Sequence, residues 1–247
     1  MLKIFSRSKQ APFQGELSFL RTDMHSHLLP GIDDGSPDLR TSLQLVRGMR
    51  DLGYTKLITT PHIMGDMYKN NPGIINEKLE VLRKAVEEEG LGVEIHAAAE
   101  YFLDDYFAAI LRTGEPLLAI SGKMILVEFS LAYPSHGLKE ILFDLQMQGY
   151  LPVIAHPERY IYLERNKEFY EELKDIGCLF QLNLLSLNGH YGKAVQELSH
   201  YLVKKEYYDL VGTDLHHSRH LEAFRNPALV NAIKKVMATG KIRNPEL

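Results

Sequence analysis

Residues 149–156 read Gly-Tyr-Leu-Pro-Val-Ile-Ala-His, and this stretch holds the structural unit that recurs along the chain. The glycine ends an apolar helical pattern, because a residue in the left-handed conformation commonly stops a helix. The apolar run that follows is typical of a strand that is buried on both faces. The run ends at His156. A helix stop, a buried strand and a strand-end histidine thus follow one another directly.

The same order of glycine and apolar run recurs twice, at residues 53–58 and 177–182. Apolar runs of this kind predict seven strands, near residues 19–24, 56–60, 93–98, 124–129, 151–155, 179–184 and 209–213. Alternation of strands with helical patterns implies a parallel sheet with right-handed crossovers. The length of 247 residues suits a (β/α) barrel, which typically needs about 250. Closing such a sheet brings the C-terminal ends of its strands together in one mouth.

The helical patterns lie between the strands. One helix is expected from Pro37 to Leu52, with Ser36 as its N-cap and Pro37 in its first position. The other apolar stripes run from Ile75 to Val86, Leu138 to Leu145 and Phe169 to Ile176. Glycines close these stripes, as they do at the ends of many helices.

Composition restricts the class of protein. The chain is 45% hydrophobic with a net charge of −4, which gives no electrostatic footprint for a nucleic acid. No apolar run approaches the ~20 residues of a membrane span. The start of the chain lacks the apolar core of a secretory signal, so a cytoplasmic enzyme is expected. Residues 1–20 are interpreted as an N-terminal arm, either loosely attached or able to dock a partner or membrane surface, before a domain at 21–247.

Histidines and acidic residues stand where six of the seven predicted strands end. They are His25, His27, His62, Glu100, Glu128, His156, Asp214 and His216. Imidazole and carboxylate groups without thiolates suit hard to borderline divalent metals. A catalytic zinc ion takes only about three protein ligands, so this set is too large for one ion. The pattern therefore predicts a multinuclear metal centre at the mouth and, with it, metal-assisted hydrolysis.

A single histidine at a strand end is more often a hydrogen-bonded structural residue than a ligand. The pair His25 and His27 favours the metal site, because residues two apart on a strand face the same side, and Asp214 with His216 repeats this spacing. The remaining histidines are interpreted as structural, although the last two neighbour the site: His96, His136, His190, His200, His217 and His220. Asp34 is either part of an acidic turn that leads into a helix or another ligand, and spacing does not distinguish the two.

Other catalytic signatures are absent from the sequence. A cysteine-dependent tyrosine phosphatase needs Cys-x₅-Arg, but Leu184 stands six residues after the only cysteine, Cys178. There is no G-x-S-x-G nucleophile elbow and no G-x-x-x-x-G-K-[ST] phosphate loop. Cys178 is expected in the core, and one cysteine cannot form a disulfide framework within the chain.

The strand-end motifs resemble those of the polymerase and histidinol phosphatase (PHP) family over about residues 21–245. The matching motifs are Asp23-Met24-His25-Ser26-His27, Pro61-His62, Glu100 and Asp214-Leu215-His216. Residues 29–35, 127–130 and 155–160 are similar to the manganese-dependent protein-tyrosine phosphatases encoded with bacterial capsule and exopolysaccharide genes.

This resemblance implies a distorted (β/α)₇ TIM-like barrel with three divalent ions, manganese in the first place and iron or zinc as alternatives. By position, the first ion would be held by His25, His27, Glu100 and Asp214. Glu100 would bridge to a second ion held by Glu128 and His156, and a third would be held by Asp34, His62 and His216. Arg159 matches one phosphate-facing arginine of the family. Arg219 is the nearest candidate for the second, because the loop after the last histidine is about two residues shorter here.

The implied activity is metal-dependent hydrolysis of phosphotyrosine on proteins, such as a bacterial tyrosine kinase that controls capsule or exopolysaccharide synthesis. Arg159, Arg219, Glu100 and Asp214 would carry the catalysis. The alternatives are a small-molecule phosphatase of the same fold, similar to histidinol-phosphate phosphatase, and a non-catalytic, metal-holding module that binds a kinase. A nuclease is disfavoured by the acidic charge, and the oligomeric state is left open.

Overall fold

Parallel strands form the centre of the molecule. The structure is a computed structural model that describes residues 15–133 and 137–247. Its strands are β1 (Thr22–Asp23), β2 (Lys56–Thr59), β3 (His62–Ile63), β4 (Glu94–Ala97), β5 (Glu100–Phe102), β6 (Met124–Glu128), β7 (Leu151–Ala155), β8 (Leu179–Asn183) and β9 (Leu210–Gly212). They form two parallel sheets, in the orders β1-β2-β4 and β3-β5-β6-β7-β8-β9.

Seven of the nine strands fall within the predicted ranges, and β3 and β5 are additional short strands beyond the predicted ends at 60 and 98. The predicted strand at 56–60 stops at Thr59 and resumes as β3 after Pro61, which has no N–H to donate to a ladder. The predicted strand at 93–98 is similarly followed by β5. The first strand is shorter than expected, because Ser18–Leu20 forms a 3₁₀ turn and only Thr22–Asp23 pairs. The predicted α/β class with parallel strands is confirmed.

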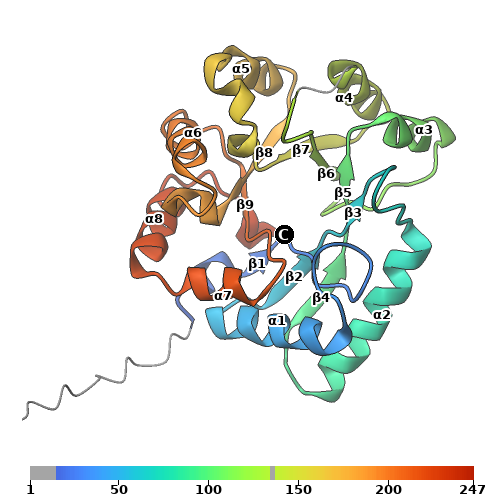
Figure 1. Ribbon diagram of the computed structural model, residues 1–247, viewed down its shortest axis with the longest axis vertical. Coiled ribbons are helices and arrows are strands. Elements are labelled where there is room, and N and C mark those ends of the chain that lie inside the picture. The colour runs from blue at the N-terminus through green and yellow to red at the C-terminus, as the bar shows by residue number, and fades with distance from the viewer. Residues whose placement is uncertain (1–14, 134–136) are drawn as a thin grey trace, which may run out of the picture.

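The first and last strands along the chain, β1 and β9, also lie side by side. Beyond their ends, the Asp214 N–H donates to the His25 carbonyl at 2.8 Å, and the His27 N–H donates to the Leu215 carbonyl at 2.9 Å. Near their starts, the Asn244 side chain donates to the carbonyls of Thr22 and Val211. Figure 1 shows the strands around the centre of the molecule and the helices outside them. The arrangement is barrel-like, with a split sheet in place of one continuous ladder.

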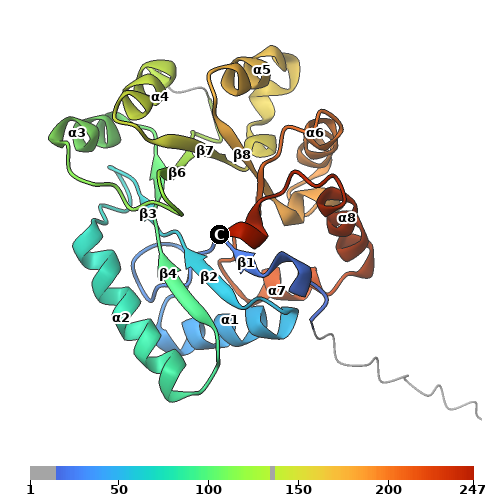
Figure 2. The same ribbon diagram turned by 180° about the vertical axis from the view of Figure 1, so that it is seen from behind.

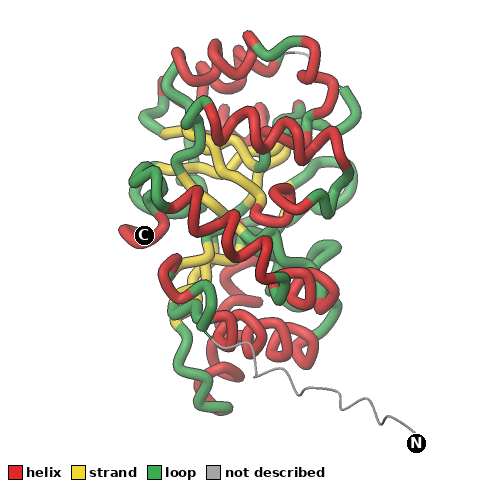
Figure 3. The backbone as a smooth tube through the Cα atoms, turned by 90° about the vertical axis from the view of Figure 1, so that its left-hand side faces the viewer, coloured by secondary structure: helices red, strands yellow, loops and turns green. Residues whose placement is uncertain are grey.

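Helices cover the outside of the strands. They are α1 (Leu39–Leu52), α2 (Pro72–Glu88), α3 (Asp105–Thr113), α4 (Leu138–Met147), α5 (Glu168–Asp175), α6 (Lys193–Lys204), α7 (Ser218–Phe224) and α8 (Pro227–Met237). Figure 3 shows the strands between helices when the molecule is seen from the side. Within the described ranges, no helix is long and apolar enough to span a bilayer.

The predicted start of the first helix is wrong. The N-cap is Asp38, whose carboxylate accepts a hydrogen bond from the Thr41 N–H at 2.7 Å. The Ser36 hydroxyl instead donates to the Asp38 carbonyl at 2.9 Å, which holds the turn that precedes the helix. An ionised carboxylate at this position also interacts favourably with the helix dipole.

The core has an outer and an inner layer. The outer layer packs the helices against outward side chains such as Leu57 and Phe180. The inner layer lies within the ring of strands and contains Met24, Ile58, Ala98, Ile120, Met124, Leu126, Val153, Ala155 and Leu210, with Leu247 packed against it. Figure 2 shows the C-terminal segment near the centre of the face opposite to that in Figure 1. The C-terminal segment therefore covers one end of the inner layer.

Only the last part of the predicted N-terminal arm is described. Residues 1–14 lie outside the described residues. Leu17 and Leu20 are fully buried in the outer core layer. The Leu17 N–H also donates to the carbonyl of Leu52, the last residue of α1. Residues 15–20 thus pack as part of the domain.

Candidate metal centre

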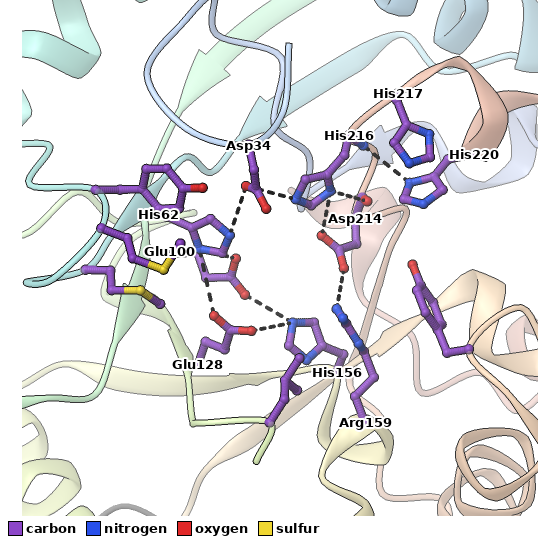
Figure 4. Close-up of a pocket in the computed structure, with 15 residues that line it drawn as sticks. Asp34, His62, Glu100, Glu128, His156, Arg159, Asp214, His216, His217 and His220 are labelled. Atoms are coloured by element: carbon purple, nitrogen blue, oxygen red, sulfur yellow. Dashed lines mark hydrogen bonds and ion pairs between the residues drawn. The ribbon is translucent and has the colours of Figure 1, made fainter. Parts of the chain in front are cut away.

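The predicted ligands gather around one cavity; Glu128 and His156 lie at the C-terminal ends of β6 and β7, whereas His62 and Glu100 are the first residues of β3 and β5. The cavity has a volume of about 380 Å³. Asp34, His62, Glu100, Glu128, His156, Asp214 and His216 line it, and Figure 4 shows their side chains pointing toward one another. His25 and His27 are fully buried beneath them. The structure therefore brings together the nine residues that the sequence and the family resemblance proposed as ligands.

Glu100, at the start of β5, is the centre of this arrangement. Its Oε2 lies 3.2 Å from Nε2 of His25 and 3.4 Å from Nε2 of His27. The same oxygen lies 3.2 Å from Nδ1 of His62, while Oε1 lies 3.2 Å from Nε2 of His156. One buried carboxylate thus faces four imidazoles from three parts of the chain.

Asp214 completes the group around His25 and His27. Its Oδ1 lies 3.4 Å from Nε2 of His25 and 3.6 Å from Nε2 of His27. Donors about 2.0–2.1 Å from a tetrahedral ion are about 3.4 Å apart. The spacing of these donor atoms therefore fits a shared cation, and the group matches the set implied for the first ion.

Glu128 and His156 lie on the other side of Glu100. Nε2 of His156 is 3.6 Å from Oε1 of Glu128, and Nδ1 of His62 is 3.8 Å from Oε2 of Glu128. His62, Glu100 and Glu128 also form a group whose donor atoms all lie within 4.8 Å of one another. The resemblance assigned Glu100, Glu128 and His156 to the second ion. In the structure, His62 also lies close to the two carboxylates of that set.

A third group surrounds Asp34. Its Oδ1 lies 3.5 Å from Nε2 of His62 and 3.5 Å from Nε2 of His216. His27 belongs to the same potential metal-binding group. The side chain of Asp34 is 52% exposed, so this group is the most open to solvent of the three. Asp34 is placed as a ligand candidate rather than only as part of an acidic turn.

Neighbouring polar groups orient three of the histidines. Nδ1 of His25 lies 2.8 Å from Oε1 of Gln181, which can only accept, so Nδ1 donates and Nε2 is left free. Nδ1 of His27 lies 2.8 Å from Oδ2 of Asp33, and Nδ1 of His216 lies 2.9 Å from the Asp214 carbonyl. Hydrogen bonds of this kind fix the ring and the tautomer of metal-binding histidines.

Several buried atoms of the donor set have no hydrogen-bond partner in the described part of the chain, as expected of atoms that bind a metal ion. Among the described residues, both carboxylate oxygens of Glu100 are buried without a hydrogen-bond donor, and Nδ1 of His62 is buried without a partner. Leaving buried polar atoms unpaired is costly, particularly for a charged carboxylate. A divalent cation would satisfy these atoms together. The chemistry of the site therefore matches oxygen- and nitrogen-binding divalent ions.

The two central carboxylates differ in acidity. Burial acts to raise the pKa of Glu100, but the imidazoles of His25 and His62 outweigh it and hold that pKa well below its usual range. Burial, with repulsion from Glu100, raises the pKa of Glu128 well above its usual range. Two adjacent buried carboxylates resist simultaneous ionisation unless positive charge lies nearby. Bound cations would allow both groups to be ionised.

His156 and Asp214 reach the cavity through unusual backbone conformations. Their φ angles are 31° and 50°, so both lie in the left-handed region. Such a conformation is uncommon for residues other than glycine and often marks a functional site. The strand β9 ends at Gly212, so the predicted reason for the convergence of Asp214 and His216, a shared strand face, is wrong. A left-handed turn at Asp214 directs these side chains instead.

Arg159 lines the cavity in the 3₁₀ turn after His156. Its Nη1 donates to Oδ2 of Asp214 at 2.9 Å, and its guanidinium carbon lies 4.7 Å from the centre of the Tyr191 ring. Asn183 donates from Nδ2 to the same Oδ2 at 2.9 Å, and to the Tyr191 hydroxyl at 3.1 Å. Asp214 thus faces the ligand group with Oδ1, and its Oδ2 accepts a hydrogen bond from Arg159.

The second predicted arginine lies elsewhere. Arg219 is exposed on α7 and is not among the residues that line the cavity, so its predicted role gains no support. His217 and His220, which were interpreted as structural, do line the cavity, and Nδ1 of His220 accepts from the His216 N–H at 3.4 Å. Of the other histidines interpreted as structural, His96 is in β4, His190 is in a loop, His200 is on α6, and His136 is outside the described residues.

Sequence reasoning missed the residues that support the ligands: Asp33, Gln181, Asn183 and Tyr191. A signal was available for two of them, because Gln181 and Asn183 are amides in the otherwise apolar stretch 179–183. Both are fully buried. A buried side-chain amide in a strand needs hydrogen-bond partners. Near the end of a strand, the closest polar groups are the predicted metal ligands.

Comparisons with known proteins agree with the site. A family model described as "Capsular polysaccharide synthesis, CpsB/CapC" matches residues 21–242. Tyrosine-protein phosphatase YwqE from Bacillus subtilis is 31% identical over 194 residues, covering 78% of this chain and 76% of YwqE. Tyrosine-protein phosphatase CpsB from Streptococcus pneumoniae is 28% identical over 200 residues, covering 78% of this chain and 82% of CpsB.

A solved structure is also similar. It is described as belonging to "YwqE from Bacillus subtilis and CpsB from Streptococcus pneumoniae, unique metal-dependent tyrosine phosphatases". The TM-score is 0.75 at 28% sequence identity, and the match covers 90% of this chain and 94% of that one. The resemblance inferred from the strand-end motifs is thereby confirmed. This chain belongs to the CpsB/CapC family of capsular polysaccharide synthesis.

Proposed function

We propose that this protein is a metal-dependent phosphatase that hydrolyses phosphotyrosine on proteins. The observation that carries the proposal is the position of Glu100, whose buried oxygens have no hydrogen-bond donor among the described residues and face imidazoles on both sides. Arg159 lies in the same cavity. The names of YwqE and CpsB, which are tyrosine-protein phosphatases, support the substrate class. Three divalent ions, with manganese as the first candidate, are proposed for the three ligand groups.

The cations, when bound, would supply Lewis acidity that activates water and neutralises charge on the phosphate oxygens. Glu100 and Asp214 would hold them in place. Arg159 would bind the phosphoryl group, because a guanidinium has five N–H donors and only one of its contacts is to a described acceptor, Oδ2 of Asp214. That contact, and the Tyr191 ring beneath the guanidinium, would hold its plane in the cavity.

The chemistry of the leaving group favours a phosphate ester of a phenol over one of an alkyl alcohol as the substrate. The hydroxyl of tyrosine has a pKa near 10 in solution, so its phenolate leaves with less need for protonation than an alkoxide. The cavity of about 380 Å³ is at the lower end of the range of about 300–1,000 Å³ for small-molecule sites. A single aromatic phosphate is therefore a suitable occupant.

The proposed protein substrate is a bacterial tyrosine kinase that controls capsule or exopolysaccharide synthesis, consistent with the family description. A cytoplasmic location is part of this proposal. The alternatives from the sequence are a small-molecule phosphatase and a metal-holding module that binds a kinase. A small-molecule phosphatase would differ in the substrate that it hydrolyses, and a binding module would hydrolyse no phosphate ester.

The test is metal analysis of the purified protein together with hydrolysis of a phosphotyrosine peptide and of histidinol phosphate. We expect more than one equivalent of divalent metal, preferential hydrolysis of the peptide, loss of activity with a chelator and recovery with Mn²⁺. Preference for histidinol phosphate would favour the small-molecule phosphatase. Bound metal without hydrolysis of either substrate would favour the binding module.

A further inference from the structure

A second groove lies beside the metal cavity. It is formed by the loops that follow three neighbouring strands, β3, β5 and β6, and it has a volume of about 500 Å³. Met67 lines it from the loop after β3 and Tyr133 from the loop after β6, and Phe102 lines it from the end of β5. Because these strands are parallel and adjacent, their loops open on the same side as the ligands. The groove thus extends the mouth of the site along the rim of the strands.

The groove adjoins the metal cavity. Met64 and Met67 line both spaces. A group bound at the ligands would therefore lie next to the groove, on the other side of these two side chains. A residue of an extended peptide spans about 3.3–3.6 Å, so residues next to a bound phosphotyrosine would lie over the groove.

Exposed apolar side chains gather here. The exposed fraction is 66% for Met67 and 66% for Tyr133. Leu131, in the same loop as Tyr133, lines the metal cavity and is 39% exposed. Large apolar side chains that cluster beside a site mark a binding surface more than isolated ones do. Methionine can also adapt its shape to different partners.

The groove is negatively charged. Asp66, Asp104 and Asp105 line it, and among the described residues that line it there is no lysine, arginine or histidine. Asp104 accepts hydrogen bonds from the N–H groups of Gly65 and Phe107. Asp66 and Asp105 form no ion pair with a described residue. A positively charged side chain in the occupant would complement them.

The wall of the groove is fixed by backbone contacts. The N–H groups of Met64 and Tyr68 each donate to the carbonyl of the other residue, at 2.9 and 3.0 Å. Between them, Gly65 packs so closely on α3 that an added Cβ would lie 2.7 Å from Cβ of Tyr106. The loop therefore holds Met64 and Met67 beside the cavity without rearrangement.

We propose that this groove binds the peptide segment that flanks the phosphotyrosine, and that it favours an apolar and a basic residue there. The proposal rests on the proposed function, because it assigns a second part of the same substrate. It predicts that recognition extends beyond the phosphorylated side chain. Small aromatic phosphates, which fill only the metal cavity, should use none of the groove.

The experiment compares three substrates on the purified, metal-loaded protein. They are O-phosphotyrosine, a peptide with leucine and lysine beside the phosphotyrosine, and the same peptide with serine and glutamate in those positions. The Tyr133→Ala variant removes a groove side chain that does not line the metal cavity. Phe143→Ala is the matched control, because Phe143 is an aromatic residue on α4 with a similar exposed fraction of 60%.

For the wild type and the control, we expect kcat/KM on the leucine–lysine peptide to exceed that on the serine–glutamate peptide by about tenfold. In Tyr133→Ala, the ratio of peptide to O-phosphotyrosine efficiency should fall about five- to tenfold through KM, as expected for one well-packed apolar contact. An equal ratio in the two variants, or equal efficiency on the two peptides, would refute the groove. Failure of the wild type to hydrolyse any of the three substrates would refute the proposed function itself.

Discussion

Replacing Glu100 with glutamine is the most direct test of the metal centre. Glutamine keeps the size of the side chain but replaces a negative oxygen with an amide that donates hydrogen bonds. Oε2 of Glu100 faces Nε2 of His25 at 3.2 Å, and Oε1 faces Nε2 of His156 at 3.2 Å. The two oxygens therefore serve two separate ligand groups. A neutral side chain here should weaken both, so bound metal should fall by about two equivalents and hydrolysis should be abolished.

The size of the effect follows from known costs. Residues that only support a ligand alter metal affinity by about 10–100-fold, so loss of a charged ligand should exceed that. An ion present at about 100 times its Kd stabilises the folded state by about 2.7 kcal/mol. For a chain of this size, 1 kcal/mol shifts the melting temperature by about 2–4 °C. The stabilisation by added Mn²⁺ should therefore be at least about 5 °C smaller in Glu100→Gln than in the wild type.

Glu158→Gln provides the matched control. Glu158 is fully buried like Glu100, but its oxygens accept hydrogen bonds from the Asn183 N–H, the Ser186 hydroxyl and the Tyr208 hydroxyl. Its carboxylate is already satisfied by the protein, so the variant should retain its metal. The assays are elemental analysis after dialysis and thermal unfolding with and without Mn²⁺. Full metal content in Glu100→Gln, or equal metal loss in both variants, would refute the bridging role.

Three further substitutions test individual roles. Arg159→Lys should keep the metal but lower kcat/KM on phosphotyrosine by roughly 10²-fold, because lysine lacks the planar fork; activity within about twofold of the wild type would rule out a catalytic role. Asn183→Ala removes a donor to Asp214, so kcat should fall by about 10–100-fold at unchanged metal content, and an unchanged kcat would contradict its positioning role. Cys178→Ala should retain near-normal turnover, because burial raises the pKa of this thiol to about 12; a folded but inactive variant would overturn the metal mechanism.

The ligands could be predicted because strand ends are easy to locate in this chain. His156 follows five residues of β7, and Glu128 is the last residue of β6. In parallel sheets the C-terminal ends lie on one side, so any chemistry placed there is brought together. The prediction needed the direction of each strand but not the exact geometry of any loop.

The supporting contacts could not be predicted in the same way. The hydrogen bond from His25 to Gln181 joins residues 156 positions apart, and it depends on β8 lying two strands away from β1, with β9 between them. The start of α1 shows a similar limit on a local scale. Ser36 and Asp38 both suit an N-cap, and the choice between them depends on the turn that Ser36 closes.

The left-handed residues show where sequence patterns lose information for a physical reason. Glycine usually marks a positive φ, because other residues pay a steric cost there. At His156 and Asp214 the side chain itself is required, so glycine would relax the backbone but remove a ligand. Each strained residue costs on the order of 1–3 kcal/mol and persists only where its surroundings hold it. Here the Asp214 N–H donates to the His25 carbonyl, and the Arg159 N–H donates to the His156 carbonyl. The residues that hold the two left-handed conformations in place therefore belong to the site themselves.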